Sequence, residues 1–227
     1  MKKVHITMIH DVVCSWCPIG YRNLSRAIEV VSEEVQAGVN FLPFELNPRM
    51  AGTGEGITEH LMHRTGMTRV QVLASRENLL AKGKEAGVNF NFSNRTHYYN
   101  SFNAHCLMHY AETQGKQSAL NEVLIEAYFS QGVDISNIDS LITLCDQVGL
   151  NKSDARTGLE SGQWASAVRE KQRRVERLEL GSVPAFIVNG EHLVSGSNSV
   201  DFFVRYLQRV EGLEQPAEMI DCQHSAF

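Results

Sequence analysis

The sequence has no apolar run of about 18 residues or more, and it carries no excess of positive charge. The first absence argues against a transmembrane helix, which needs about 20 consecutive apolar residues to cross a bilayer. The second argues against a nucleic-acid-binding surface, because 26 acidic residues outnumber 21 basic ones and the net charge is −5. We therefore expect neither nucleic acid nor a membrane among the partners of this chain.

Cysteine is scarce as well: the 227 residues include five, an odd number that does not fit a framework of paired structural disulfides. Residues 1–7 contain a basic pair but no apolar core of the kind that a secretion signal has. We expect them to form the first strand of the fold. An odd cysteine count without a secretion signal favours a reducing compartment, so the predicted location is the cytoplasm.

Two of the cysteines form the motif Cys14-Ser15-Trp16-Cys17, which is followed by Pro18. The motif lies between a strand-like segment and a helical pattern, so Cys14 is expected at a helix N-terminus. Partial positive charge and free backbone N–H groups at such a position lower a cysteine pKa from about 8.5 to roughly 3.5–7.5. Pro18 fits the first helical turn, where a missing N–H costs little. The motif predicts thiol–disulfide exchange.

The residues around this motif predict a β-α-β unit. Apolar and polar residues alternate over residues 4–8, the pattern of a strand. Apolar residues at helical spacing then run from Leu24 to Val35, and Gly38 is expected to end this helix. A second strand is expected over residues 39–46, where Pro43 indicates a sheet edge or a bulge.

A block of helices is predicted between about residues 47 and 164. Thr68 is the expected N-cap of a helix that ends at Gly87, and further helical patterns cover residues 103–114, 118–130 and 137–148. In the last of these, Cys145 belongs to an apolar stripe. We expect its thiol to be buried as a small hydrophobic group rather than reactive.

Strand patterns return near the C-terminus. Residues 183–188 form a short apolar run, Asn189-Gly190 predicts a two-residue hairpin turn, and the second strand begins at His192. A helix is expected over about residues 200–210, and a polar tail follows. Cys222 lies in that tail, where an incidental free thiol and an extra resolving thiol are both open interpretations. The predicted fold class is α/β.

Several short motifs carry a resemblance to a known family. They are Cys14-Ser15-Trp16-Cys17-Pro18-Ile19-Gly20, Phe44-Glu45-Leu46-Asn47-Pro48, Asn100-Ser101-Phe102-Asn103-Ala104-His105, Ala127-Tyr128-Phe129 and Ser182-Val183-Pro184-Ala185-Phe186. With them, the sequence resembles the DsbA-like thioredoxin-fold family over about residues 4–210. Within that family it is similar to the FrnE-type branch, which is related to 2-hydroxychromene-2-carboxylate isomerase and kappa-class glutathione transferase.

The resemblance implies a thioredoxin-like fold with a large all-helical domain inserted between its β-α-β half and its β-hairpin-α half. The expected domains are residues 1–47 and 166–212 for the two thioredoxin-like halves, 48–165 for the helical insertion and 213–227 for the tail. A cis-proline is expected at Pro184, facing the Cys-x-x-Cys helix. Many relatives have glycine where Ser182 stands and threonine where Ala185 stands, which leaves substrate preference open.

The same resemblance implies a thiol–disulfide oxidoreductase, specifically a protein disulfide oxidoreductase of the DsbA/FrnE kind. Cys14 would be the attacking or leaving thiol in disulfide exchange, and Cys17 would be the resolving thiol that releases the partner from the mixed disulfide. The expected substrate contacts are Ser15, Trp16, Val183 and Pro184. Expected partners are disulfides or thiols of proteins or small molecules, with glutathione as a candidate co-substrate and no bound cofactor besides the redox-active disulfide. The redox direction and the oligomeric state, a dimer included, stay open.

Three polar residues are candidates for a proton relay or for the cleft. His10 and Asp11 directly precede the Cys-x-x-Cys loop, and His105 belongs to one of the family motifs. A group poised beside a catalytic thiol can accept its proton. Ordinary strand-end polarity explains the first two equally well, and a packing role explains His105.

A zinc site is the other common interpretation of Cys-x-x-Cys, but it needs two further ligands. The sequence has no second Cys-x-x-Cys, and only His105, Cys106 and His109 offer closely spaced donors. Such residues more often pack in a helix or lie on its surface, so no metal site is expected.

Two other classes of function are kept as alternatives. A glutathione-dependent isomerase or transferase would act on a small molecule, but the related branches carry a serine near the first cysteine position, whereas this chain keeps both cysteines. A chaperone-like binding protein would use an exposed apolar patch around Trp16 and Val183.

Overall fold

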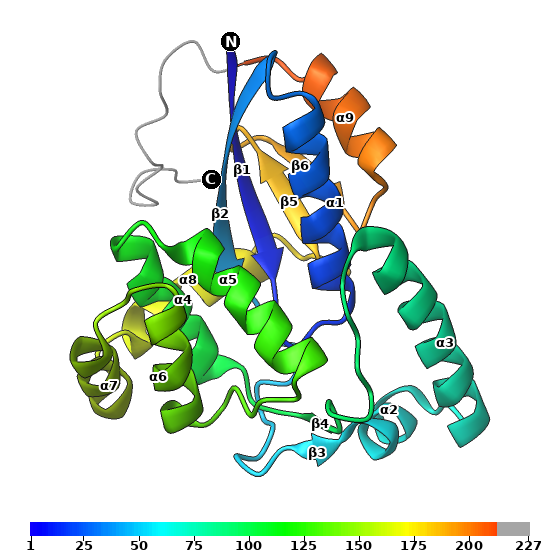
Figure 1. Cartoon of the computed structure of the whole chain (residues 1–227), viewed down its shortest axis with the longest axis vertical. Helices are drawn as coiled ribbons and strands as arrows, with labels where there is room; N and C mark the ends of the chain where they lie inside the picture. The colour runs from blue at the N-terminus through cyan, green and yellow to red at the C-terminus, as the bar shows by residue number, and fades with distance from the viewer. Residues whose placement is uncertain (213–227) are drawn as a thin grey trace.

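The computed structural model describes residues 1–212, in which four strands form the main sheet in the order β2-β1-β5-β6 (Figure 1). β1 pairs with β2 in parallel and with β5 antiparallel, and β6 pairs antiparallel with β5. The predicted tail at residues 213–227, with Cys222, lies outside the described residues. The strands are β1 (Lys2–His10), β2 (Val35–Pro43), β5 (Ala185–Val188) and β6 (His192–Ser195).

β1 confirms the strand predicted at the N-terminus. Val4, Ile6 and Met8 are buried, as their alternation with polar residues requires. β2 lies at the edge of the sheet, and Pro43 is its last residue. A proline is tolerated there because its missing N–H removes no hydrogen bond from the sheet interior.

The first helix, α1 (Trp16–Val30), is shorter than the sequence pattern predicted. Val35 does not continue the helix but begins β2, and it pairs with Lys2 in a parallel register that runs nine residues to His10 and Pro43. Chain reversal between α1 and β2 takes only residues 31–34, so Gly38 lies inside the strand. The apolar side chain of Val35 is buried in either geometry, which is why helical spacing alone misplaced it.

The middle of the chain is mostly helical, as predicted, and Thr68 caps α3 with Gly87 at its end. It is not all-helical, because β3 (Glu55–Gly56) and β4 (His97–Tyr98) form a small antiparallel ladder below the main sheet (Figure 1). The domain boundaries at residues 47 and 165 stay a prediction. The helices are α2 (Ile57–Thr65), α3 (Arg69–Ala86), α4 (Phe102–Thr113), α5 (Gln117–Ile125) with a π-helical turn (Glu126–Ser130), α6 (Ile138–Gln147) and α7 (Lys152–Ser161).

The C-terminal half contains α8 (Ala165–Glu176), the β5–β6 hairpin and α9 (Val200–Arg209). The hairpin differs from the two-residue turn expected at Asn189-Gly190: Val188 pairs with His192, so three residues connect the strands. Asn189 and Gly190 both have positive φ, which their residue types tolerate. α1 and α9 pack side by side in front of the sheet, and α8 lies behind it against β2 (Figure 1).

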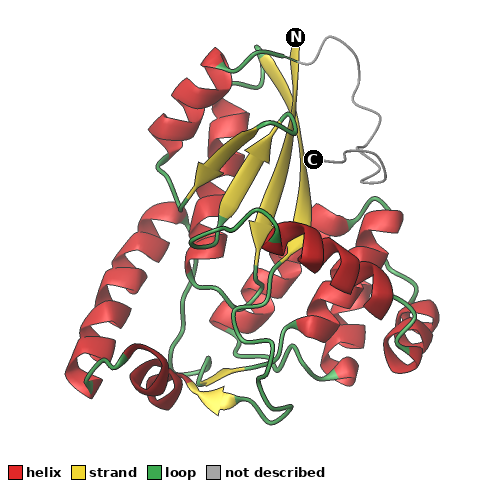
Figure 2. Cartoon of the chain, turned by 180° about the vertical axis from the view of Figure 1, so that it is seen from behind, coloured by secondary structure: helices red, strands yellow, loops and turns green. Residues whose placement is uncertain are grey.

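Buried residues from the sheet and from the helical block form one continuous hydrophobic core. Cys145 is fully buried in it, which confirms its predicted packing role. Within residues 1–212, no helix is long and apolar enough to cross a membrane. Seen from behind, the main sheet lies above most of the helical block (Figure 2), and α1 begins shortly after β1 ends. The arrangement confirms the α/β fold class.

Candidate active site

Cys14 and Cys17 lie where β1 ends and α1 begins. Backbone hydrogen bonds shape this junction: the Cys14 N–H donates to the Asp11 carbonyl at 3.0 Å, and the Cys17 N–H donates to the Cys14 carbonyl at 3.1 Å. Trp16 is the first helical residue, so the Cys14 sulfur lies at the helix N-terminus, close to the backbone N–H groups of Trp16 and Cys17. Both cysteines are buried and unpaired, with Cys14 slightly the more exposed.

The loop before β5 faces Cys14 across a sequence separation of 169 residues. The Cys14 Sγ atom lies 3.6 Å from the Val183 carbonyl oxygen, and the Val183–Pro184 peptide bond is cis. Gly20 permits this close approach of α1, since a Cβ there would lie 2.9 Å from Pro184 Cγ. The structure thus brings the Cys-x-x-Cys motif and the proline loop together.

The two thiols differ in acidity. The pKa of Cys14 is lowered, first by a hydrogen bond from the Cys17 side chain and then by the backbone N–H groups of Trp16 and Cys17, against the opposing effect of burial. The pKa of Cys17 is raised well above its usual value, mainly by burial and then by its interaction with Cys14. Cys14 is therefore the more easily ionised of the two thiols, and Cys17 stays protonated at neutral pH.

The predicted polar residues lie beneath this pair. Asp11 is fully buried, and its carboxyl oxygens accept hydrogen bonds from the Leu46 N–H at 2.6 Å and the Val13 N–H at 3.3 Å. His105 Nε2 lies 3.5 Å from the same carboxyl group. The His10 and His105 rings meet edge to face at 5.7 Å between centroids. His10, Asp11 and His105 therefore form one buried cluster.

The hydrogen bonds of this cluster fix one tautomer. His105 Nε2 lies 2.9 Å from the Phe44 carbonyl, and because a carbonyl only accepts, this nitrogen carries a proton. Burial lowers the pKa of His10 to about 3, the neighbouring His105 lowering it further and Asp11 opposing. His10 is therefore a neutral imidazole at physiological pH.

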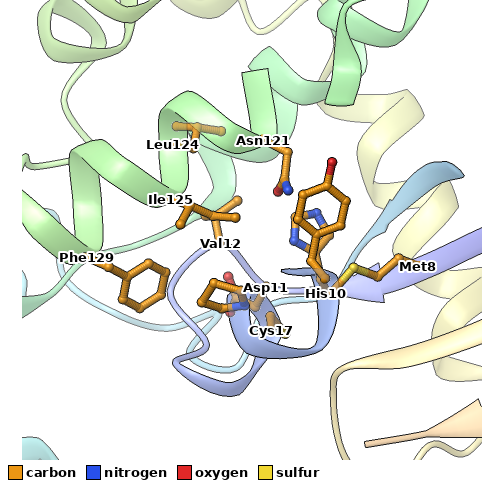
Figure 3. A pocket seen from close by; sticks show the side chains of 11 residues that line it. Met8, His10, Asp11, Val12, Cys17, Asn121, Leu124, Ile125 and Phe129 are labelled. Carbon is orange, nitrogen blue, oxygen red and sulfur yellow. The ribbon is translucent and has the colours of Figure 1, made fainter. Parts of the chain in front are cut away.

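A small cavity lies directly behind Cys17 (Figure 3). Its volume of about 10 Å³ is close to what one water molecule requires. Figure 3 shows Asn121 reaching down from α5 toward the His10 ring, while Asp11 and Cys17 line the lower side. The helical block therefore closes the inner side of the Cys-x-x-Cys motif.

The outer side of the motif is open. Trp16 is 39% exposed and Ser15 is half-buried, whereas Val183 and Pro184 are buried. A groove of about 400 Å³ runs from Trp16 between α1, α3 and the start of α9. The expected exposed patch around Trp16 and Val183 thus consists of Trp16, because Val183 is covered.

Sequence patterns missed two residues near the site, Asn121 and Arg95. Asn121 is one of two buried polar residues of α5, the other being Gln117. Arg95 is buried in a loop and donates to the Val13 carbonyl at 3.3 Å. Its only signal in the sequence is the density of aromatic residues on both sides of it.

Other histidine and cysteine residues take part in separate contacts. His60 and His63 share the Glu55 carboxylate, with nitrogen–oxygen distances of 2.6 and 3.1 Å. Burial raises the pKa of Cys106 to about 12, so this thiol stays protonated. Across residues 1–212, no three His, Cys, Asp or Glu side chains converge in an arrangement that suits a metal ion.

Comparison with known proteins agrees with this geometry. The DSBA-like thioredoxin domain matches residues 5–208. The uncharacterized protein YwbO of Bacillus subtilis is 26% identical over 201 residues, which cover 88% of this chain and 94% of that protein. A probable DsbA oxidoreductase from Streptomyces coelicolor superposes with a TM-score of 0.83 at 23% identity, covering 93% of each chain.

More distant structures share the same fold. The cytosolic disulfide reductase DsbM from Pseudomonas aeruginosa superposes with a TM-score of 0.63 at 16% identity, covering 90% of this chain and 97% of DsbM. A structure of 2-hydroxychromene-2-carboxylate isomerase gives a TM-score of 0.61 at 13% identity, covering 90% of this chain and 95% of the isomerase. The FrnE-type branch is compatible with these neighbours. The family match over most of the chain shows that this protein belongs to the DSBA-like thioredoxin domain family, whose fold supports thiol–disulfide oxidoreductase or related isomerase chemistry.

Proposed function

We propose that the protein is a thiol–disulfide oxidoreductase that uses Cys14 and Cys17 as its redox pair. The observation that carries this proposal is the opposite acidity of the two thiols: the pKa of Cys14 is lowered, and that of Cys17 is raised. A thiolate attacks a disulfide, whereas a protonated thiol waits until a mixed disulfide has formed. Cys14 is also the slightly more exposed of the two thiols, which supports its role as the first nucleophile.

In the proposed reaction, the Cys14 thiolate attacks one sulfur of a substrate disulfide. A Cys14–substrate disulfide forms, and the other substrate sulfur leaves as a thiolate. Cys17 then loses its proton and attacks the Cys14 sulfur, which forms the Cys14–Cys17 disulfide and releases the second substrate thiolate. Two electrons pass from the protein dithiol to the substrate, and the reverse sequence oxidises a substrate dithiol.

Asp11 is the proposed acceptor of the Cys17 proton. Both residues line the small cavity behind the motif, which can hold one bridging water. His10 and His105 are proposed to position this carboxyl group rather than to accept the proton themselves. Two features support that division: the pKa of His10 is about 3, and His105 Nε2 already donates to the Phe44 carbonyl.

Substrate is proposed to approach from the side of the exposed Trp16, along the groove between α1 and α3. Ser15 would line the approach to the sulfur, and the buried Val183–Pro184 loop would lie against Cys14 on its inner side. A protein disulfide is the proposed substrate, and glutathione is the proposed small-thiol partner. DsbM, which shares the fold, has a structure with GSH and is described as cytosolic, in line with the cytoplasmic location proposed for this chain.

The proposal is tested by mapping disulfides in the intact chain after oxidation with glutathione disulfide. We expect one disulfide between Cys14 and Cys17. Cys17→Ser is expected to accumulate a mixed disulfide with glutathione at Cys14, because the resolving thiol is missing. Cys14→Ser is expected to form neither product and to lose disulfide-exchange activity by at least a hundredfold.

Cys145→Ser serves as the matched control, since Cys145 is a buried thiol remote from the motif and its pKa is raised to about 11. It should exchange disulfides at the wild-type rate. Absence of any disulfide or adduct at Cys14 would refute the proposal. Glutathione conjugation of a small electrophile that survives Cys14→Ser would instead favour a transferase.

A further inference from the structure

Arg95 is a buried cation beside the redox motif. Its side chain is 2% exposed, in the loop between α3 and β4. Four aromatic rings surround the guanidinium, with distances to the ring centroids of 4.7 Å for Tyr128, 4.8 Å for Phe129, 5.1 Å for Tyr98 and 5.8 Å for Phe92. The negative faces of aromatic rings attract a cation, so this cage stabilises the charged guanidinium although it is buried away from water.

The polar contacts of Arg95 are few. Of its five N–H donors, one on Nη2 donates to the Val13 carbonyl at 3.3 Å, and the buried Nε atom has no partner. Within residues 1–212, no carboxylate lies close enough to form an ion pair with it. Buried arginines are normally paired with an acid, because an isolated charge loses its hydration. The guanidinium therefore has no anionic partner among the described residues, and its other polar interactions are with the side chains of Tyr98 and Tyr128.

That charge lies against the peptide that leads into Cys14. The carbonyl that accepts from Arg95 belongs to Val13, the residue directly before the first thiol. In a buried setting a nearby positive charge favours the anionic form of an acid. In the reduced protein, the acid next to this peptide is the Cys14 thiol, and its anionic form is the thiolate.

We propose that Arg95 is a positioning residue of the redox site, which holds the loop before Cys14 through the Val13 carbonyl and whose charge favours the thiolate form of Cys14. This inference rests on the proposed role of Cys14 as the nucleophile. Cys17 and Asp11 are the titratable groups that face Cys14. The titratable groups that face Arg95 are Tyr98 and Tyr128, and Arg76 lies near the same aromatic cage.

The test measures alkylation of Cys14 by iodoacetamide against pH in the reduced full-length chain, with the Cys14 peptide quantified by mass spectrometry. Two neutral variants, Arg95→Met and Arg95→Gln, remove the charge, and Arg95→Lys retains it. We expect the pH midpoint of Cys14 alkylation to rise by about one unit in both neutral variants, a tenfold loss of thiolate below the midpoint. In Arg95→Lys the midpoint should stay within about 0.3 unit of wild type.

Arg76→Met is the matched control. Arg76 also lies over the Phe92 ring, at 5.2 Å, but it donates to the Thr58 hydroxyl rather than to the redox loop. Its removal should leave the midpoint unchanged. A midpoint that does not move in the neutral variants, or that moves equally in Arg95→Lys or Arg76→Met, overturns the inference.

Failure of both neutral variants to fold, judged by near-ultraviolet circular dichroism, overturns the inference too, since Arg95 would then serve the stability of the fold. A different result of the same experiment would refute the proposed function of the Cys14–Cys17 pair. In that case the wild-type chain itself would show an ordinary thiol midpoint near 8.5, or no reaction at Cys14.

Discussion

Acidification is expected to destabilise this protein through one buried histidine. The pKa of His10 is about 3 in the folded protein and 6.5 in an exposed chain, because burial disfavours the imidazolium. Between those two values the unfolded chain binds a proton that the folded protein does not. The free energy of unfolding therefore rises with pH in this window. The stability that neutral His10 contributes is lost progressively as the pH falls from about 6.5 toward 3.

The magnitude follows from the two pKa values. At pH 5.0 the proton bound by the unfolded chain lowers the free energy of unfolding by about 2 kcal/mol relative to pH 7.5, and the full effect near pH 3 approaches about 5 kcal/mol. Typical domains have only 5–15 kcal/mol of stability, so the loss is readily measurable. His10 is fully buried, so solvent does not screen the effect.

Guanidinium chloride unfolding of the reduced chain at pH 7.5, 6.0 and 5.0 checks this prediction. His10→Gln cannot be protonated, so its loss of stability between pH 7.5 and 5.0 should be smaller than that of wild type by about 2 kcal/mol. His192→Gln is the control, because His192 lies exposed on β6, and the loss of stability of this variant between these pH values should match that of wild type. Equal pH dependence in His10→Gln and wild type would refute the reasoning.

Two further predictions concern the same site. Asp11→Asn removes the proposed proton acceptor, so resolution of a glutathione mixed disulfide at Cys14 should slow by about a hundredfold in stopped-flow measurements. The initial attack should not slow, because the Asp11 charge raises the pKa of Cys14 and its removal favours the thiolate; equal slowing of both steps would contradict that role. Gly20→Ala places a Cβ 2.9 Å from Pro184 Cγ and should lower the free energy of unfolding by about 1–3 kcal/mol in chemical denaturation, whereas Gly181→Ala, which meets no neighbour, should not.

Much of the fold could be predicted because its signals are local. Alternation of apolar residues marks β1, and Thr68 with Gly87 marks both ends of α3. The predicted element bounds are wrong where a local sequence pattern favours one structure and strand pairing with a distant residue favours another. Val35 fits a helical stripe, but parallel pairing with Lys2 places it in β2. The small β3–β4 ladder has two residues a strand, too few for any periodicity to show.

The candidate site was predicted in part for the same reason. A thiol pair at a helix start is a local pattern, so Cys14 and Cys17 stand out in the sequence. His10 and Asp11 are adjacent to the motif, but only the structure shows that both are buried and that His105 joins them. The cavity that they share with Asn121 depends on how α5 packs, which no short pattern encodes.

The Cys14–Cys17 pair and its place at the start of α1 follow from the sequence alone, since helix formation and thiol spacing depend on neighbouring residues. Tertiary structure alone decided what surrounds that pair. Val183 reaches Cys14 across 169 residues, and Arg95 reaches Val13 across 82. Whether a thiol ionises or a histidine stays neutral depends on burial and on charges from distant segments, and both exist only once the chain has packed.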